Sequence, residues 1–185
     1  MSIVFLFGPS CAGKSTLGKA LQESLGSQWH YIDRDDLVEQ GVCPEKQAND
    51  ELEARICGLS RKIIIDAQIP WRKKREEERY FLILPPLAIL LERDALRTQE
   101  LERNRQVALV AREYVKETHE VLSKIDKEGF DECFDSSRVA LADEVRSIQK
   151  HISLPEQFSI PVIKCLLAAS VIFGVLCALK RLRKL

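Results

Sequence analysis

The sequence predicts an α/β fold in which helices cover both faces of a five-stranded parallel sheet. Three observations carry this prediction. Short apolar runs typical of buried strands recur along the chain, segments with apolar residues at helical spacing separate them, and a glycine-rich loop joins the first strand to the first helix. We therefore expect one three-layer domain over residues 1–151. Its expected strands span residues 3–7, 29–32, 62–66, 79–84 and 130–135.

The charge balance argues against a nucleic-acid partner. The 185 residues include 28 Lys and Arg and 28 Asp and Glu, so the chain has no net basic field. Six cysteines occur without C-x-x-C spacing, and no signal peptide precedes the first strand. These features predict a reduced domain that faces the cytosol.

The glycine-rich loop carries the clearest functional motif, GxxxxGK[ST], between a buried strand and a helix. Its backbone N–H groups and the positive end of the helix are suited to hold phosphate oxygens. We expect Lys14 to bridge the β- and γ-phosphates of ATP and the Ser15 hydroxyl to contribute to a Mg²⁺ site. The predicted nucleotide-binding residues are Gly8, Pro9, Ser10, Cys11, Ala12, Gly13, Lys14, Ser15 and Thr16.

Three carboxylates, Asp33, Asp35 and Asp36, follow the second expected strand. Open α/β sheets bind ligands at the carboxyl ends of their strands, and a phosphoryl-transfer enzyme needs a carboxylate there to accept the proton of an acceptor hydroxyl. The alternative is that Asp33 or Asp35 only caps the following helix. Both interpretations stay open for this segment.

The β-branched run at residues 62–66 ends in Asp66, which resembles a Walker B carboxylate that reaches Mg²⁺ directly or through water. A helix cap is again the alternative. Pro70 and Trp71 then predict the start of a helix whose charged run, RKKREEER, is an exposed face of paired charges.

An arginine-dense segment over residues 92–105 follows the fourth expected strand. Guanidinium groups at this point of a small kinase belong to a lid that closes over the transferring phosphoryl group, so Arg93 and Arg97 are candidate catalytic residues. The alternative is an ordinary helix surface. Further on, we expect a long helix to about Lys127 and a last helix over residues 138–151, capped by Ser136 and Ser137.

Taken together, the motifs resemble the chloramphenicol phosphotransferase-like family of small P-loop kinases over about residues 2–150. The resemblance implies a P-loop NTPase fold of the nucleoside- and small-molecule-kinase type, and it places the catalytic carboxylate at Asp35. The pattern around Asp35 is also similar to that of polynucleotide 5′-hydroxyl kinases, where the matching position is the base. The motifs that carry the resemblance are GPSCAGKST (8–16), YIDRDDL (31–37), IIID (63–66), ERDALR (92–97) and FDECFDSS (130–137).

The C-terminus differs in composition from the rest of the chain. Residues 160–179 form an apolar run of about the length that spans a bilayer, with Lys164 close enough to one end to reach the interface. We expect a linker at 152–159, a transmembrane helix at 160–179 and a basic tip at 180–185. A buried or interfacial helix is the alternative. The anchor would leave the kinase domain facing the cytosol.

The sequence therefore predicts a membrane-anchored, ATP- and Mg²⁺-dependent kinase that phosphorylates a hydroxyl of a small molecule. Asp35, Lys14, Arg93 and Arg97 are the expected catalytic residues, and Ser15 and Asp66 the metal ligands. Two alternatives remain: a nucleoside, nucleotide or polynucleotide 5′-hydroxyl kinase, and a membrane-bound nucleotide-dependent switch or adaptor without kinase activity. The acceptor and the oligomeric state are not specified by the sequence.

Overall fold

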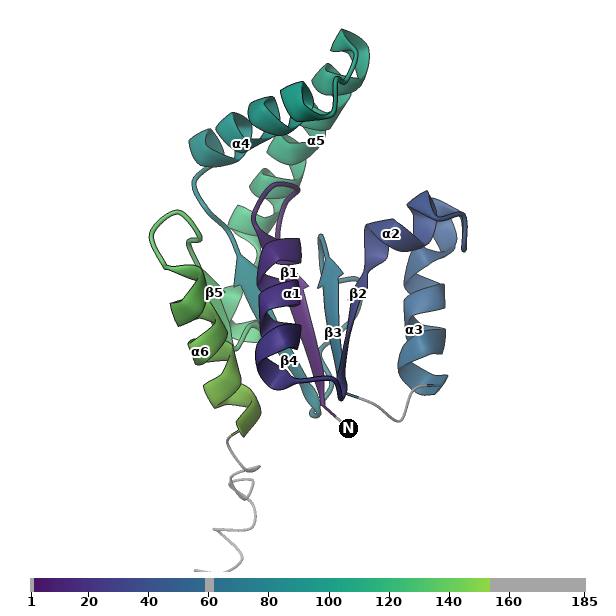
Figure 1. Cartoon of the computed structure of the whole chain (residues 1–185), viewed down its shortest axis with the longest axis vertical. Helices are drawn as coiled ribbons and strands as arrows, with labels where there is room; N and C mark the ends of the chain where they lie inside the picture. The colour runs from purple at the N-terminus through teal and green to yellow at the C-terminus, as the bar shows by residue number, and fades with distance from the viewer. Residues whose placement is uncertain (1, 59–61, 154–185) are drawn as a thin grey trace, which may run out of the picture. The chain divides into compact units, whose positions relative to one another are not determined.

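A computed structural model describes residues 2–58 and 62–153 of the chain. Its centre is a five-stranded, all-parallel sheet with the strand order β2-β3-β1-β4-β5, which confirms the predicted sheet (Figure 1). The central strand, β1, is buried along its whole length because neighbouring strands flank it and helices lie over the sheet. The strands are β1 (Ile3–Phe7), β2 (Trp29–Asp33), β3 (Lys62–Ala67), β4 (Glu78–Ile83) and β5 (Glu132–Phe134).

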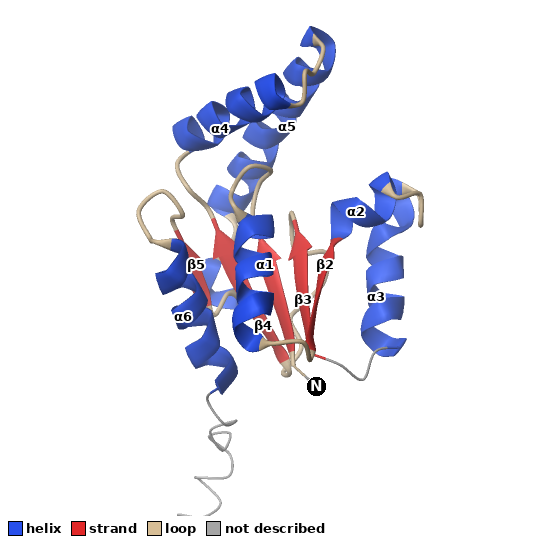
Figure 2. Ribbon diagram, in the orientation of Figure 1, coloured by secondary structure: helices blue, strands red, loops and turns tan. Residues whose placement is uncertain are grey.

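Helices cover both faces of the sheet, and Figure 2 shows α1 and α6 on the face toward the viewer. Because successive side chains of a strand point to opposite faces, Val4 and Leu6 pack in one core cluster, and Phe5 and Phe7 pack in the other. The helices are α1 (Lys14–Leu25), α2 (Arg34–Glu39), α3 (Ala48–Gly58), α4 (Leu87–Glu100), α5 (Arg105–Lys124) and α6 (Leu141–Ser153), with 3₁₀ turns η1 (Glu45–Gln47) and η2 (Lys127–Gly129).

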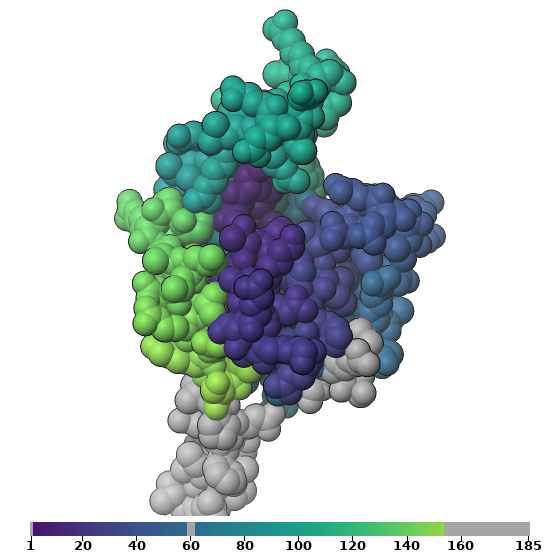
Figure 3. Space-filling model, in the orientation of Figure 1, coloured from purple at the N-terminus to yellow at the C-terminus, as the bar shows by residue number. Residues whose placement is uncertain are grey.

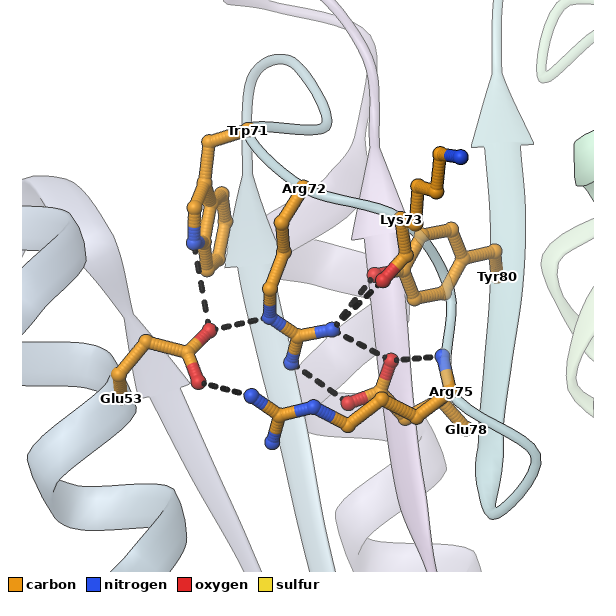
Figure 4. Close-up of polar contacts among 7 residues, drawn as sticks. All are labelled: Glu53, Trp71, Arg72, Lys73, Arg75, Glu78 and Tyr80. Atoms are coloured by element: carbon orange, nitrogen blue, oxygen red, sulfur yellow. Dashed lines mark hydrogen bonds and ion pairs between the residues drawn. The ribbon is translucent and has the colours of Figure 1, made fainter.

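The connection from β3 to β4, residues 68–77, is not the helix that the sequence predicted. It is an irregular segment, which we call the β3–β4 connection, and several of its side chains pack against the sheet or bind residues near it. The Trp71 ring packs edge-on against Phe5 and Phe7. The Arg72 guanidinium binds the fully buried Glu78 carboxylate at 2.6 and 2.7 Å and also contacts Glu53 of α3 (Figure 4).

The physical reason for this difference is that some charged side chains of the run form ion pairs with carboxylates of other elements, whereas others are exposed to solvent. Arg72 lies between two carboxylates of other elements, and Lys74 pairs with Asp131 at 2.5 Å, so both long side chains point inward. In a regular helix, the 3.6-residue period would decide the directions of these two side chains, whether or not a carboxylate lay there. Only part of the run, such as Lys73 and Glu76, is the exposed charged surface that the sequence predicted.

The helices α4 and α5 form a hairpin that rises beyond the carboxyl edge of the sheet (Figure 1). The C-terminal half of α5 returns to the sheet, where Leu122 is fully buried in the same cluster as Leu37 of α2. The hairpin therefore overhangs the edge at which parallel α/β sheets bind their ligands.

The predicted apolar span at 160–179 and the basic tip at 180–185 lie outside the described residues, as does the linker beyond Ser153. Within residues 2–58 and 62–153, no helix combines the length and the hydropathy that a membrane crossing requires.

Candidate active site

The loop between β1 and α1 has the backbone of an anion-binding site. Cys11 and Gly13 both adopt positive φ angles, 64° and 99°. Residues in the left-handed backbone region that alternate with right-handed ones turn successive N–H groups toward a common point, which can hold an anion. The N-terminus of α1 follows directly and adds its own free N–H groups. Gly13 suits this conformation because it has no Cβ, whereas Cys11 adopts it at a steric cost. The nine residues predicted to bind the nucleotide, 8–16, thus form one continuous loop and helix start.

Lys14 lies at the base of this loop as the first residue of α1 and is only 7% exposed. Its Nζ donates a hydrogen bond to the Pro9 carbonyl oxygen at 3.1 Å and lies 3.4 Å from Asp66 Oδ1. The ammonium group is therefore held beneath the loop, between its backbone and a carboxylate. This is the position from which a lysine can reach phosphates held by the loop.

Ser15 joins two carboxylates at the carboxyl ends of β2 and β3. Its hydroxyl donates to Asp66 Oδ2 at 2.9 Å and lies 3.4 Å from Asp33 Oδ2. Asp33 and Asp66 are paired residues of neighbouring parallel strands, which explains why the two carboxylates meet. Burial raises the pKa of Asp66, the Asp33 charge adds to the rise, and the Lys14 ammonium opposes it.

Tyr31 completes this cluster and is not among the site residues predicted from the sequence. Its hydroxyl donates to Asp66 Oδ2 at 3.1 Å and Asp33 Oδ2 at 3.3 Å, and burial raises its pKa. The ring crosses α1 at Gly18, where a Cβ atom would lie 2.3 Å from Tyr31 Cε2. The sequence did contain a signal: Tyr31 lies two positions before Asp33 in one strand, so both side chains point to the same face.

The donor set of this cluster fits a hard divalent cation. Ser15, Asp33 and Asp66 offer hydroxyl and carboxylate oxygens, the ligands that Mg²⁺ prefers. The described residues contain no group of three His, Cys, Asp or Glu side chains arranged to hold a metal. A Mg²⁺ site in nucleotide enzymes commonly uses one or two carboxylates together with substrate phosphates and water, which matches what Ser15 and Asp66 can supply.

Asp35 is half exposed and is not one of the carboxylates that Ser15 binds. Its side chain is 49% exposed, it accepts a hydrogen bond from Gln68 Nε2 at 3.2 Å, and it lies 3.4 Å from Arg34. Asp33 caps α2 instead, because its Oδ1 accepts from the Asp35 N–H at 3.0 Å. The cap and the exposed carboxylate are therefore two different residues.

Arg93 of α4 reaches the phosphate loop, whereas Arg97 does not. The Arg93 guanidinium donates to the carbonyl oxygens of Cys11 and Ala12 at 3.3 and 3.4 Å and to Ser136 at 3.1 Å. Arg97 is exposed, and its guanidinium forms no hydrogen bond or ion pair with the residues that the structure describes. The structure thus brings one of the two predicted lid arginines to the loop.

The predicted cap at Ser136 and Ser137 is wrong, since α6 begins at Leu141. Ser136 is used elsewhere: its hydroxyl donates to the Ala12 carbonyl oxygen at 2.7 Å and accepts from Arg93. Ser137 instead donates to Asp135 within a tight turn. The segment after β5 therefore supports the phosphate loop rather than starting a helix.

A buried glutamate, Glu144 in the first turn of α6, was not predicted as a site residue. It is 3% exposed, and its Oε1 has no hydrogen-bond partner among the described residues. Burial raises its pKa to about 7, the Arg93 charge opposes the rise and the Asp135 charge adds to it. From sequence it resembles an ordinary acidic residue in the first turn of a helix.

Comparisons with known proteins agree with these features. A family profile described as chloramphenicol phosphotransferase-like protein matches residues 1–69, which contain the phosphate loop, Asp35 and Asp66. No curated protein matches the sequence.

Solved structures extend the likeness of fold over most of the chain. A shikimate kinase from Bacteroides thetaiotaomicron has a TM-score of 0.56 at 17% identity, covering 83% of this chain and 99% of that one. A gluconokinase from Sinorhizobium meliloti 1021 has a TM-score of 0.50 at 18% identity, with coverage of 78% and 87%. An uncharacterized protein from Eubacterium ventriosum has a TM-score of 0.58 at 13% identity, with coverage of 84% and 100%.

At these identities the structures establish the fold alone, which is that of the P-loop kinases. The family match over residues 1–69 adds the sequence relationship that the motifs indicated. The protein is thus a P-loop protein of kinase-like fold that resembles the chloramphenicol phosphotransferase-like family.

Proposed function

We propose that the protein is an ATP- and Mg²⁺-dependent phosphotransferase that moves the γ-phosphate to a hydroxyl group of a small molecule. One observation carries the proposal: Lys14, Ser15 and Asp66 converge beneath the phosphate loop, and the half-exposed Asp35 follows β2 at the same edge of the sheet. Phosphoryl transfer needs these two halves, a phosphate-binding site and an adjacent base. The kinase-like fold and the family match support it.

On the nucleotide side, the loop N–H groups and the Lys14 ammonium would bind the phosphates. Ser15 and Asp66, with Asp33 behind them, would hold Mg²⁺, which when bound offsets charge on the phosphate oxygens. Lys14 would exchange part of its interaction with Asp66 for phosphate oxygens, since both compete for one ammonium group.

On the acceptor side, Asp35 would take the proton of the acceptor hydroxyl as its oxygen bonds to the γ-phosphorus. The bond from that phosphorus to the bridging oxygen breaks, and ADP leaves with the electron pair. Gln68 supports this role because its Nε2 holds Asp35 Oδ2 in place at 3.2 Å. Arg34 lies 3.4 Å from the other carboxylate oxygen, Oδ1, and so helps to fix its position.

The two arginines of α4, Arg93 and Arg97, would have different roles in phosphoryl transfer. Arg93 already holds the loop through the Cys11 and Ala12 carbonyl oxygens, so we assign it a positioning role together with charge compensation. Arg97 follows one turn later on an exposed face, and its contribution would require the hairpin to close over the nucleotide.

The test is transfer of label from γ-labelled ATP to pools of metabolites, nucleosides and oligonucleotides. We expect the wild-type protein to label a small alcohol and Lys14→Ala to lose that labelling. Label on nucleosides or on 5′-hydroxyl ends would instead favour the nucleoside or polynucleotide kinase. ATP binding without label in any acceptor would favour the nucleotide-dependent switch.

We further propose that residues 160–179 anchor the protein to a membrane as a single C-terminal span, with the kinase domain on the cytosolic side. The support is compositional: the segment is apolar over about 20 residues.

A further inference from the structure

All four oxygens of the Asp33 and Asp66 carboxylates lie beside hydrogen-bond donors of the chain itself. The Oδ1 atom of Asp33 accepts a hydrogen bond from the Asp35 N–H at 3.0 Å. The Oδ1 atom of Asp66 lies 3.4 Å from Lys14 Nζ, so this oxygen belongs to an ion pair. The two Oδ2 atoms are left to face the other members of the cluster.

The two Oδ2 atoms share the hydroxyl groups of Ser15 and Tyr31. Ser15 Oγ lies 2.9 Å from Asp66 Oδ2 and 3.4 Å from Asp33 Oδ2. Tyr31 Oη lies 3.1 and 3.3 Å from the same two atoms. Each hydroxyl has a single hydrogen, and a phenol keeps its hydrogen at neutral pH. Tyr31 therefore donates to one of the two Oδ2 atoms and takes up one of their lone pairs.

The Tyr31 ring is held in place by α1, which covers the middle of this face of the molecule in purple (Figure 3). A Cβ atom at Gly18 of this helix would lie 2.3 Å from Tyr31 Cε2, so the ring and the helix backbone are in close contact. The ring also packs against the core cluster that includes Leu17 and Leu21. A tyrosine has only two side-chain torsions, and this packing restricts both. The hydroxyl therefore stays beside the two carboxylates.

Mg²⁺ and Ca²⁺ differ in how many protein oxygens they need. Mg²⁺ binds few carboxylate oxygens and keeps several water molecules, whereas Ca²⁺ takes about six to eight oxygen ligands and often both oxygens of one carboxylate. The part of the chain that the structure describes has no group of three His, Cys, Asp or Glu side chains around a common point. A Ca²⁺ ion would therefore depend on contacts with both oxygens of Asp33 or Asp66, and these oxygens are already engaged.

We propose that Tyr31 makes the site selective for Mg²⁺ over Ca²⁺. By donating to Asp33 or Asp66, its hydroxyl takes a carboxylate lone pair that Ca²⁺ needs and Mg²⁺ does not. Tyr31 is thus a positioning residue that acts through the two carboxylates, and it is not itself a metal ligand. The inference rests on the proposed function, because it concerns the cation that accompanies ATP in the same site.

The test is calorimetric binding of a non-hydrolysable ATP analogue to the full-length protein in detergent, with saturating Mg²⁺ or with saturating Ca²⁺. The quantity compared is the ratio of the Kd of the Ca²⁺ complex to the Kd of the Mg²⁺ complex, which requires no acceptor. We expect the wild type to bind the Mg²⁺ complex more tightly. Tyr31→Phe should lower the ratio by about fivefold, as for the loss of one net hydrogen bond. Both complexes are measured on one preparation, so a smaller folded fraction affects both values equally.

The matched control is Tyr80→Phe, which also removes a phenol hydroxyl from the sheet. Tyr80 is 4% exposed, its hydroxyl accepts from Arg72 at 3.3 Å, and its ring packs in the core cluster on the opposite face of the sheet. This control should keep the wild-type ratio. Gly18→Ala is a second variant that displaces the Tyr31 ring while every carboxylate and hydroxyl remains in the chain, and it should lower the ratio as well.

The proposal is overturned if Tyr31→Phe keeps the wild-type ratio, if Tyr80→Phe lowers the ratio equally, or if the wild type binds the two complexes with the same Kd. If only Tyr31→Phe and Gly18→Ala lower the ratio and no acceptor is labelled by γ-labelled ATP, the selectivity role stands and the proposed phosphotransferase function fails. If an acceptor is labelled and the ratio does not depend on Tyr31, the function stands and the selectivity role fails.

Discussion

Gly18 leaves no room for a side chain, because the Tyr31 ring occupies the place of its Cβ. We predict that Gly18→Ala displaces Tyr31 and breaks the bonds from its hydroxyl to Asp33 and Asp66. The unfolding free energy should fall by about 1–3 kcal/mol, as for overpacked cores, and ATP affinity should fall with it. Denaturant unfolding and nucleotide titration measure both effects.

Gly129→Ala is the matched control for this prediction, because a Cβ atom there meets no other atom within 4 Å. The control should change the unfolding free energy by less than about 0.5 kcal/mol. A Gly18→Ala protein as stable and as tight for ATP as the control would show that Tyr31 does not organise the two carboxylates.

Glu144 predicts a pH dependence of stability. Its pKa is about 7 in the folded protein, above the usual 4.5, so the folded state holds this proton more tightly than the unfolded state. The contribution of Glu144 to the unfolding free energy is therefore present below about pH 4.5 and is lost as the pH rises toward 7. Between pH 5 and pH 8 the wild-type protein should lose about 2 kcal/mol relative to Glu144→Gln.

Denaturant unfolding of both proteins at several pH values measures this difference. Glutamine has the shape of protonated glutamate and does not titrate, so the Glu144→Gln profile carries the pH dependence of all other groups. Arg93 and Asp135 are the charged groups that act on Glu144, and both remain in the variant. If the unfolding free energies of the two proteins changed with pH in the same way, Glu144 would ionise in the folded protein with no loss of stability.

The sequence predicted those residues of the candidate site whose positions follow from the motif or strand in which they lie. Lys14 and Ser15 follow from the loop motif, and Asp66 follows from its place at the end of a β-branched strand. Tyr31 and Glu144 could not be predicted in the same way. Their importance arises from contacts with distant segments, and a tyrosine in a strand or a glutamate in a first helical turn has an ordinary local explanation.

At the scale of elements, Arg72 is the centre of the polar contacts that hold the β3–β4 connection on the sheet (Figure 4). Arg72 binds both oxygens of Glu78, and this carboxylate, together with Glu53 and Tyr80, raises the pKa of the guanidinium. Arg72 in turn keeps the pKa of Glu78 below its usual value despite burial, which acts in the opposite direction. The pair is stable only as a unit, because each charge would be costly alone.

We therefore predict that Arg72→Met lowers the unfolding free energy by about 3 kcal/mol, since it leaves the fully buried Glu78 without its partner. Lys73→Met is the control, because this neighbouring side chain is exposed and its ammonium group makes none of the contacts drawn in Figure 4. The control substitution should change the unfolding free energy by less than about 0.5 kcal/mol. Chemical denaturation compares the two. Equal stability of both variants would mean that Trp71 packing alone holds the connection.

The elements that the sequence predicted well are those with a strong periodic signal. The strands β1 and β3 and the helix α1 have near-continuous apolar or clearly helical patterns, and each was placed within one or two residues. The connection at 68–77 was assigned a helix because its charge run has no competing local signal. The start of α6 was placed too early because Ser136 contacts Ala12, far away in the sequence.

At the scale of the whole molecule, the proposed membrane anchor at residues 160–179 leads to a prediction for the full-length protein. We predict that it fractionates with membranes and resists alkaline extraction, and that truncation after Pro155 releases a soluble, active kinase domain. The reason is that about 20 mostly apolar residues cannot remain solvated, while every kinase motif precedes Leu154.

Two substitutions refine this prediction. Val171→Arg places a charge in the middle of the proposed span and should impair insertion far more than Lys164→Leu, near its end. Full-length protein that purifies as a detergent-free monomer would contradict the anchor. In that case the segment would pack on the kinase domain, and the truncated protein would be destabilised.

The measurement that tests the phosphotransferase account most directly is single-turnover transfer of γ-labelled phosphate from ATP to the acceptor, in the wild type and in Asp35→Asn. The amide keeps the shape of the side chain but cannot take the proton of the hydroxyl. We predict that Asp35→Asn binds MgATP within about twofold of the wild type and transfers phosphate about 10²–10⁴ times more slowly. Equal transfer by both proteins, or no transfer by a wild-type protein that binds MgATP, would contradict the account.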